Sequence, residues 1–281
     1  MRRELADFWK FRSLLWVLVR RDLKVRYKNS RLGFFWSIAP PLLQVLVITY
    51  AFKNLTGIMR DIPNYSAYLL VAMIPWTYTS TALLDSSQSI LLMYGVIKKV
   101  YLPREVIPLS SAISNFIHFL LSWCVFFVYW YGFRRGPVLP TVLWMPYLVL
   151  CQFMFVTGLS LFISCLNVFY EDVKYILTVL LQLGLFLFPI MYIVEMMDPR
   201  GKLTQMGGAL AVFLYMNNPI TALINGYRKA LLEPPPPVAL KMPYLPIDVP
   251  SLLLTGFVSF AVLVAGYAYF NSRKWSFVER P

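Results

Sequence analysis

Charged residues are scarce in this 281-residue chain and are missing altogether from long parts of it. Asp, Glu, Lys and Arg make up 14% of the sequence, whereas ordinary soluble domains contain about 25%. Hydrophobic residues make up 59%, and the mean hydropathy is +0.62. This composition excludes a typical soluble domain and predicts an all-α integral membrane protein.

Residues that carry out catalysis or bind metals are also rare. The chain has one histidine, His118, and three cysteines, Cys124, Cys151 and Cys165, all inside apolar runs without metal-ligand spacing. It has no glycine-rich phosphate loop, nucleophile elbow or His-Glu metal motif. We therefore predict no metal site, no catalytic residue, no cofactor bound by this chain, and no enzymatic activity of its own.

The apolar runs themselves contain no carboxylate that could serve ion coupling. Carriers driven by protons or sodium usually bury carboxylates in the membrane, so we expect the energy to come from elsewhere. His118, one turn after Asn115, could relay protons or make a structural hydrogen bond, and the sequence leaves both readings open.

Membrane spans are predicted from the stretches that lack charge. Seven stretches are long enough for a helix to cross a hydrocarbon core of about 30 Å. They are residues 32–52, 62–84, 106–133, 136–170, 175–194, 203–227 and 249–272. The sixth contains Gly207-Gly208 and Asn217-Asn218-Pro219, which favours a re-entrant outer element. Within it we predict a helix that begins at Asn218 with Pro219 at its first position. We predict six transmembrane helices.

The distribution of the cations gives the orientation. With six spans, seventeen of the 26 Lys and Arg residues lie on the side of both termini and nine on the other. Because cytoplasmic loops are enriched in Lys and Arg, both termini are predicted to be cytoplasmic. This placement also explains the net charge of +13 without a nucleic-acid partner.

We expect residues 1–281 to form a single transmembrane permease domain. Its predicted parts are a cytoplasmic interface helix with a basic elbow (6–32), spans one to five (33–194), an outer gate segment (195–249), and span six with a cytoplasmic tail (250–281). The interface helix is amphipathic, being too charged to span and too apolar to stay in water. No cleaved signal peptide is expected.

Two polar loops and a set of aromatic residues stand out. The elbow carries Lys24, Arg26, Tyr27 and Lys28, which could bind a lipid phosphate or anchor the chain to anionic lipid. The charged break at 96–108, between two apolar blocks, could dock a partner or bind lipid. Uncharged aromatic rings can stack on sugars, and the candidates in or near spans are Tyr50, Trp76, Tyr78, Phe186, Phe188 and Tyr192.

Four motifs, in order along essentially the whole chain, resemble the permease subunit of type-2 ABC exporters for polysaccharide and polyol phosphate. They are Arg21-Asp-Leu-Lys-Val-Arg-Tyr-Lys28 with Leu32-Gly33 and Trp36, Lys98 to Leu109, Asn167 to Asp172 running into Phe188 to Tyr192, and Asn218-Pro219 before Tyr227-Arg228. Members of this family export O-antigen, capsule or teichoic acid. The tetraproline Pro234 to Pro237 departs from the family pattern.

The resemblance implies a homodimer in the bacterial inner membrane with two ABC ATPase subunits, which bind ATP and Mg²⁺, docked on the cytoplasmic side. It implies a coupling contact at Lys98, Lys99, Tyr101, Leu102, Pro103, Arg104, Glu105, Glu171 and Asp172. It also implies that a polyprenyl-pyrophosphate-linked glycan enters at Lys24, Arg26, Tyr27 and Lys28, and that an outer gate includes Asn218, Pro219, Tyr227 and Arg228. Teichoic acid remains an alternative substrate, and an integral membrane lipid-linked sugar transferase remains an alternative function.

Overall fold

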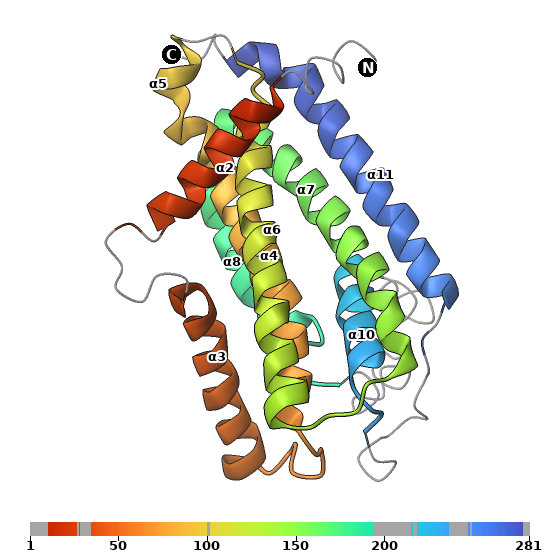
Figure 1. The fold of residues 1–281 in the computed structure, drawn as a ribbon. Coiled ribbons are helices and arrows are strands. Elements are labelled where there is room, and N and C mark those ends of the chain that lie inside the picture. Colours follow the sequence, from red (N-terminus) through yellow and green to blue (C-terminus); the bar gives the residue numbers. More distant parts are fainter. Residues whose placement is uncertain are drawn as a thin grey trace.

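A computed structural model describes residues 11–26, 28, 35–99, 102–193, 215, 218–235, 247 and 249–277 of the chain, with residues 35–38 described by their backbone alone. Within these ranges the protein is all-α (Figure 1). The α-helices are α2 (Arg12–Arg26), α3 (Phe35–Tyr50), α4 (Tyr65–Leu92), α5 (Tyr94–Ile97), α6 (Val106–Phe127), α7 (Met145–Phe169), α8 (Val173–Leu187), α10 (Pro219–Leu231) and α11 (Val249–Arg273). The π-helices η1 (Ala51–Leu55) and η2 (Val128–Phe133) extend α3 and α6, while the 3₁₀ helices η3 (Pro140–Trp144) and η6 (Lys274–Phe277) precede α7 and follow α11.

Four helical stretches in the described part of the chain are long and apolar enough to cross a membrane. They are Tyr65–Leu92, Val106–Phe133, Pro140–Phe169 and Val249–Phe277, of 28 to 30 residues each. At about 1.5 Å per residue such helices exceed the roughly 30 Å hydrocarbon core. The predicted all-α integral membrane protein is thus confirmed, while α3 and α8, with 16 and 15 residues, are shorter.

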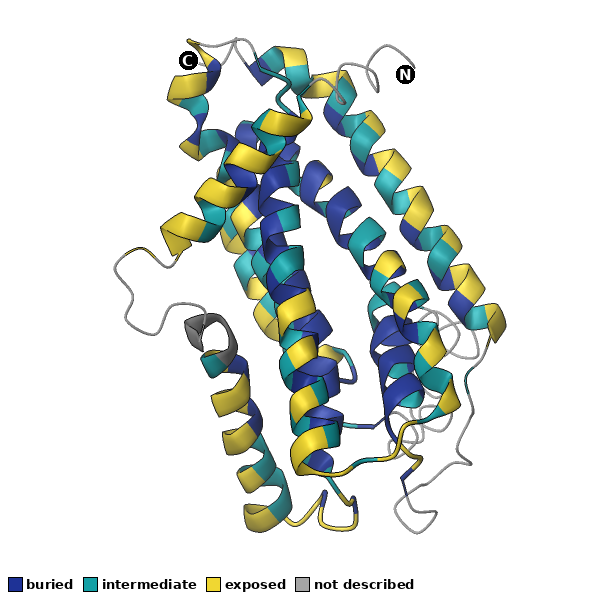
Figure 2. Cartoon of the chain, viewed as in Figure 1, coloured by how far each residue is buried: buried dark blue, intermediate teal, exposed yellow. Residues whose placement is uncertain are grey.

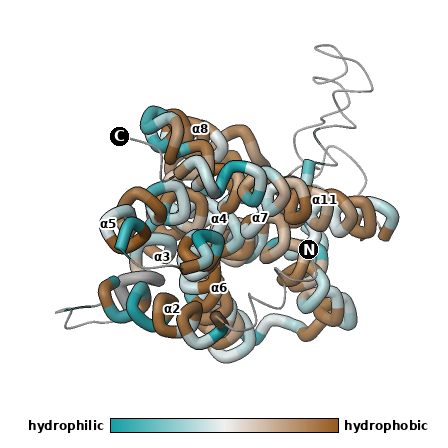
Figure 3. Tube along the Cα trace, turned by 90° about the horizontal axis from the view of Figure 1, so that it is seen from above, coloured by the Kyte–Doolittle hydropathy of each residue, from teal (hydrophilic) through white to brown (hydrophobic). Residues whose placement is uncertain are grey.

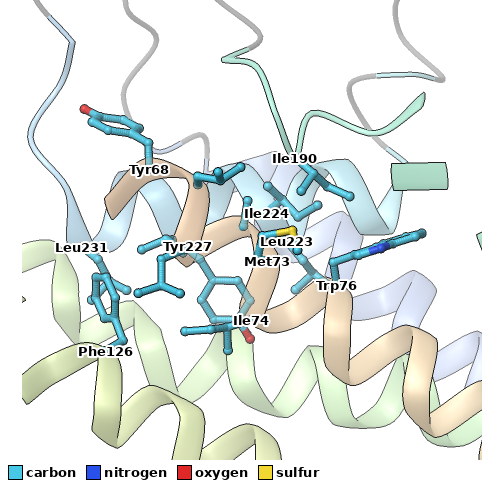
Figure 4. Packing of buried hydrophobic residues seen from close by; sticks show 14 of the residues in the cluster. Tyr68, Met73, Ile74, Trp76, Phe126, Ile190, Leu223, Ile224, Tyr227 and Leu231 are labelled. Atoms are coloured by element: carbon cyan, nitrogen blue, oxygen red, sulfur yellow. The ribbon is translucent and has the colours of Figure 1, made fainter. Parts of the chain in front are cut away.

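The central helix of the bundle is α4, and α11 lies at its edge. In the most apolar part of each helix, 78% of the residues of α4 are buried but only 22% of those of α11. Figure 2 shows the same contrast between the central helix and the edge helix. Seen along the bundle, α6, α7 and α8 surround α4 (Figure 3). The large core joins α4 to α6, α7 and α10, with Met73, Phe126 and Tyr227 among its buried side chains (Figure 4).

A second, smaller core lies at the end of the bundle where α2 crosses it (Figure 1). We call it the basal cluster. Its buried members are Leu18, Ile90, Met93, Ile97, Val106, Ile107, Leu161, Cys165, Val168, Phe270 and Phe277. These residues come from α2, α4, α5, α6, α7, α11 and η6. The cluster therefore holds the loop between α5 and α6 and the turn between α7 and α8 against the bundle.

The edge helix α11 is held by a close glycine contact with α7. A Cβ atom placed on Gly266 would lie 2.1 Å from the carbonyl oxygen of Gly158, and one on Gly158 would lie 2.5 Å from that of Val262. Small residues allow such backbone contact between membrane helices. The packing of α11 therefore depends on two positions that lack a side chain.

Two predicted boundaries were wrong. Span two was expected to end at residue 84, but α4 continues to Leu92 and carries Asp85, because a charged residue near a membrane surface need not end a helix. The basic elbow was expected from residue 21, but α2 continues to Arg26, so Lys24 and Arg26 are helical. Span six, predicted over 249–272, coincides with α11.

Candidate functional site

The loop between α5 and α6 presents two exposed cations at the basal end. Lys98 and Lys99 follow α5, and the Lys98 ammonium lies 4.5 Å from the centre of the Tyr94 ring. Tyr101 lies outside the described residues. Leu102 is half-buried and packs against the basal cluster. This part of the loop thus offers positive charge on an apolar support.

The end of this loop is held by contacts within the subunit. Arg104, where the resemblance implies a coupling contact, already has a partner within the subunit, because its guanidinium donates a hydrogen bond to the backbone oxygen of Lys274. Glu105 is buried, and its Oε1 lies 3.5 Å from the Lys274 ammonium. Pro103 precedes α6, and its carbonyl accepts a hydrogen bond from the Val106 amide. The cause is η6, which folds back onto this loop.

The turn between α7 and α8 lies at the same end and exposes two carboxylates. Glu171 and Asp172 are exposed, and the amides of Tyr175 and Ile176 donate to the Asp172 carbonyl as α8 begins. The buried Asn167 fixes the turn, since its amide donates to the Ser87 carbonyl (2.9 Å) and its oxygen accepts from the Lys174 amide (3.1 Å). The two candidate coupling segments therefore share one scaffold.

Of the predicted lipid-phosphate residues, Lys24 and Arg26 lie on α2, and Arg26 is paired within the subunit. Lys24 and Lys28 are exposed, while Tyr27 lies outside the described part of the chain. Arg26 forms an ion pair with Asp85 on α4, and its Nη1 lies 3.0 Å from the Asn115 oxygen on α6. Asp85 was missed because the charge-free criterion ended span two just before it.

A cavity of about 270 Å³ opens beside Arg26 between α2, α3, α4 and α6. Its polar lining comprises Arg26, Thr77, Tyr78, Thr81, Asn115, His118 and Ser122. Pro40 and Pro41 of α3 close another side. His118 thus belongs to a polar pocket next to a charged pair, although whether it relays protons or only makes hydrogen bonds stays a prediction.

The aromatic residues proposed for a glycan path divide into two groups. Trp76 and Tyr78 are buried, with ring centres 5.6 Å from Phe188 and 4.8 Å from Phe119. Trp76 packs inside the subunit, while Tyr78 packs on Phe119 and also lines the cavity beside Arg26. Tyr50 on α3 and Phe186 on α8 are exposed, and they remain the accessible candidates.

Tyr192 and half-buried Phe188 lie just beyond α8. The Tyr192 hydroxyl lies 2.5 Å from that of Tyr215 and 2.9 Å from the Leu187 carbonyl. Burial, together with the hydrogen bond to Tyr192, raises the pKa of Tyr215 above the ordinary phenol value. The Tyr215 hydroxyl therefore stays neutral, as an uncharged polar site requires.

The predicted outer gate residues belong to α10. As expected, Asn218 begins this helix, its side-chain oxygen accepting from the Ile220 amide at 3.0 Å, with Pro219 in the first turn. Tyr227 is fully buried in the large core. Of the tetraproline, Pro236 and Pro237 lie outside the described residues.

Arg228 is the strongest anchor of this region, a role its sequence position did not reveal. It is 4% exposed, and its guanidinium donates to the carbonyls of Tyr68 (3.1 Å), Pro189 (2.7 Å), Ile190 (2.7 Å) and Tyr192 (2.9 Å). The Arg228 guanidinium thus connects α10 to the first turn of α4 and to the turn after α8.

Comparison with known proteins agrees with this architecture. Residues 13–232 match the family described as ABC-2 type transporter. The O-antigen export system permease protein RfbA of Klebsiella pneumoniae is 31% identical over 95% of this chain and 94% of its own length, and a second Klebsiella protein of that name is 30% identical over the same shares. RfbA of Myxococcus xanthus is 30% identical over 99% of both chains. The chain therefore belongs to the ABC-2 type transporter family and is a membrane permease subunit of that family.

Proposed function

We propose that this chain is the membrane subunit of an ATP-driven exporter of a polyprenyl-pyrophosphate-linked polysaccharide of the O-antigen type. The observation that carries the proposal is similarity over nearly the full length to permeases named for O-antigen export. The similarity covers nearly the full length of both proteins, which supports a shared set of helices and loops.

The energy comes from a separate ATP-binding subunit in this proposal. Two segments that face the same end, Lys98 to Glu105 and the turn at Glu171 and Asp172, form its docking surface. Exposed cations and carboxylates on a rigid apolar support suit a polar contact that must transmit force. ATP and Mg²⁺ would be bound by that partner and not by this chain.

The proposed topology has six spans, with both termini in the cytoplasm of a bacterium and the protein in its inner membrane. Four spans are supported by helix length. Continued by η1, α3 covers Phe35 to Leu55, and α8 would cross a bilayer thinned beside it. The 13-residue α10 is too short to span, which supports a re-entrant helix near the outer face.

The proposed assembly is a homodimer. One face of α8 is apolar and exposed over its whole length, and it consists of Tyr175, Ile176, Val179, Leu180, Leu183, Phe186 and Leu187. The exposed ring of Tyr50 on α3 is a further apolar surface. In a dimer, α8 and α3 of two copies would enclose a path lined by uncharged and aromatic side chains.

The lipid-linked substrate would enter beside α2, where Lys24, Arg26 and Lys28 present cations at the depth of the headgroups. A pyrophosphate could bind the two exposed lysines directly. Arg26 would have to exchange its carboxylate partner for the phosphate, and this exchange is plausible because the pair with Asp85 is partly exposed and so is weak.

Purification of the chain with its cognate ATP-binding subunit tests the proposal. We expect a stable complex with vanadate-sensitive ATP hydrolysis, and we expect Tyr101→Ala and Arg104→Glu to lower export per ATP hydrolysed while insertion and dimerisation persist. The absence of any complex would contradict the proposal. Glycosyl transfer by the isolated chain would instead support a sugar transferase, and ATP-dependent export of a polyol phosphate alone would indicate a teichoic-acid exporter.

A further inference from the structure

The segment that follows α11 contacts the loop between α5 and α6, called here the coupling loop, although the two lie far apart in sequence. η6 comprises Lys274–Phe277 and lies after residue 232, where the family match ends. Its residues touch the loop before α6, the end of α7 and the end of α11. These contacts join three elements that are far apart in sequence.

The deepest contact is made by Phe277. Its side chain is fully buried in the basal cluster. The ring centre lies 5.8 Å from that of Phe169 at the end of α7 and 5.5 Å from that of Phe270 on α11, the latter in an edge-to-face arrangement. Such packing fixes the position of η6 relative to both helices.

Polar contacts then join η6 to the coupling loop. Arg104 donates to the Lys274 carbonyl and lies 5.6 Å from the Trp275 ring centre and 5.9 Å from that of Phe277. The Lys274 ammonium pairs with Glu105, and both side chains are nearly buried. A buried pair is screened by salt much less than a surface pair, so the loop is held firmly.

Trp275 differs from its neighbours because it is exposed. Its side chain is 64% accessible, although one region of its ring faces Arg104. Tryptophan and arginine are the residue types most often found as anchors in protein interfaces. Exposed Lys98, Lys99 and Arg273 lie at the same end, so a complementary partner surface would be acidic.

We propose that η6 is part of the docking surface for the ATP-binding subunit, with Trp275 inserted into an acidic-rimmed hollow of that subunit. In this arrangement Lys274 and Phe277 are positioning residues that hold Arg104 and Glu105 in place. Movement of the partner is then passed to α6, α7 and α11 together. The proposal rests on the proposed function, because it requires an ATP-binding subunit at this end.

Chemical labelling tests the contact directly. A Trp275→Cys variant, made with Cys124→Ser to remove the exposed native thiol, is placed in lipid nanodiscs and treated with a membrane-impermeant maleimide. We expect labelling to be roughly tenfold slower once the ATP-binding subunit is bound, as for a residue within an interface core. A Phe133→Cys control at the other end, 80% exposed, should react at an unchanged rate.

Two labelling results would overturn the proposal. Equal rates with and without the bound subunit would place Trp275 outside the interface. Slow labelling in nanodiscs without the subunit would place the ring at the membrane surface, where tryptophan is also common.

Coupling provides the second readout. We expect Trp275→Ala to lower export per ATP hydrolysed by roughly tenfold, as loss of an interface anchor does, and Trp275→Phe to restore most of it. The matched control is Phe257→Ala, which removes an exposed aromatic ring from α11, the helix that precedes η6. Phe277→Leu, which keeps an apolar side chain, should fold and show a smaller coupling defect than Phe277→Ala.

The outcomes separate the two proposals. If the wild-type chain binds no ATP-binding subunit, the proposed function fails. If it binds and exports normally while position 275 is unprotected and Trp275→Ala is fully coupled, only the role of η6 fails.

Discussion

Arg228 shows how one buried side chain can organise an otherwise irregular region. Four backbone carbonyls from two separate segments accept its hydrogen bonds. Because this site is buried, the carbonyls have no bulk water at hand to replace a lost partner. The segment after α8 therefore depends on this residue more than on local helix propensity.

Arg228→Met is expected to destabilise the protein strongly. Loss of several charge-assisted hydrogen bonds, each worth about 1.5 kcal/mol or more, leaves the carbonyls unsatisfied, so the free energy of unfolding should fall by at least ~3 kcal/mol. The measurement is thermal unfolding in detergent. Arg60→Met, which removes an exposed arginine, should leave the midpoint unchanged, and equal midpoints for both variants would contradict the anchoring role.

Arg26 and Asp85 form a pair that the sequence did not suggest. A double-mutant cycle with Arg26→Ala and Asp85→Ala should give a coupling energy of only about 0.5 kcal/mol, because both side chains are partly exposed and screened. Asp85→Asn should also strengthen binding of anionic phosphate lipids, since it releases Arg26. A coupling above ~2 kcal/mol would show that the pair is structural and unavailable to substrate.

The sequence predicted residue types better than residue partners. Asn218 and Pro219 were recognised because a helix start is encoded within four neighbouring residues. The partners of Arg26, Arg104 and Arg228 lie 36 to 170 residues away in sequence. A single sequence contains no signal for such long-range pairs, which arise only when the helices pack.

At the scale of single elements, α11 depends on its contact with α7. Gly266→Ala should lower the free energy of unfolding by about 1 to 3 kcal/mol, because the new methyl group would overlap the Gly158 carbonyl. Gly132→Ala is the matched control, since nothing lies within 4 Å of its Cβ position. Comparable unfolding midpoints in the two variants would contradict close packing of α7 and α11.

The exposed face of α8 is expected to meet a second copy of the chain. Leu183→Cys in a Cys124→Ser background should form a covalent dimer on mild oxidation, which requires Cα atoms within about 7 Å. Phe260→Cys, on the exposed face of α11, should stay monomeric because that face contacts lipid. A covalent dimer of the Phe260→Cys variant on α11, with none of the Leu183→Cys variant on α8, would contradict the assignment of the dimer interface to α8.

Helix boundaries were predictable where hydrophobicity changes at the membrane surface, as at both ends of α11. They were wrong where a helix continues beyond the membrane, as α4 does by eight residues after Leu84. A charged residue indicates where a helix leaves the lipid. It does not indicate where the backbone hydrogen bonds of the helix end. The extended end of α4 places Asp85 beside α2 and supports the basal cluster.

At the scale of the whole molecule, the bundle has two distinct ends. One end contains α2, the two candidate coupling segments and η6, all resting on the basal cluster. The other contains α10, anchored by Arg228 in the large core. The central α4 passes through both cores and so connects a proposed input of energy to a proposed outer gate.

Reconstituted transport tests this account most directly. The chain and its ATP-binding subunit, inserted into proteoliposomes, are supplied with a polyprenyl-pyrophosphate-linked glycan on the side of the ATP. We predict that glycan becomes accessible to a glycosidase on the opposite side only when ATP is hydrolysed, and that Arg104→Glu reduces this without dissociating the dimer. Transfer that proceeds equally without ATP, or no transfer by a complex that hydrolyses ATP and binds the glycan, would contradict it.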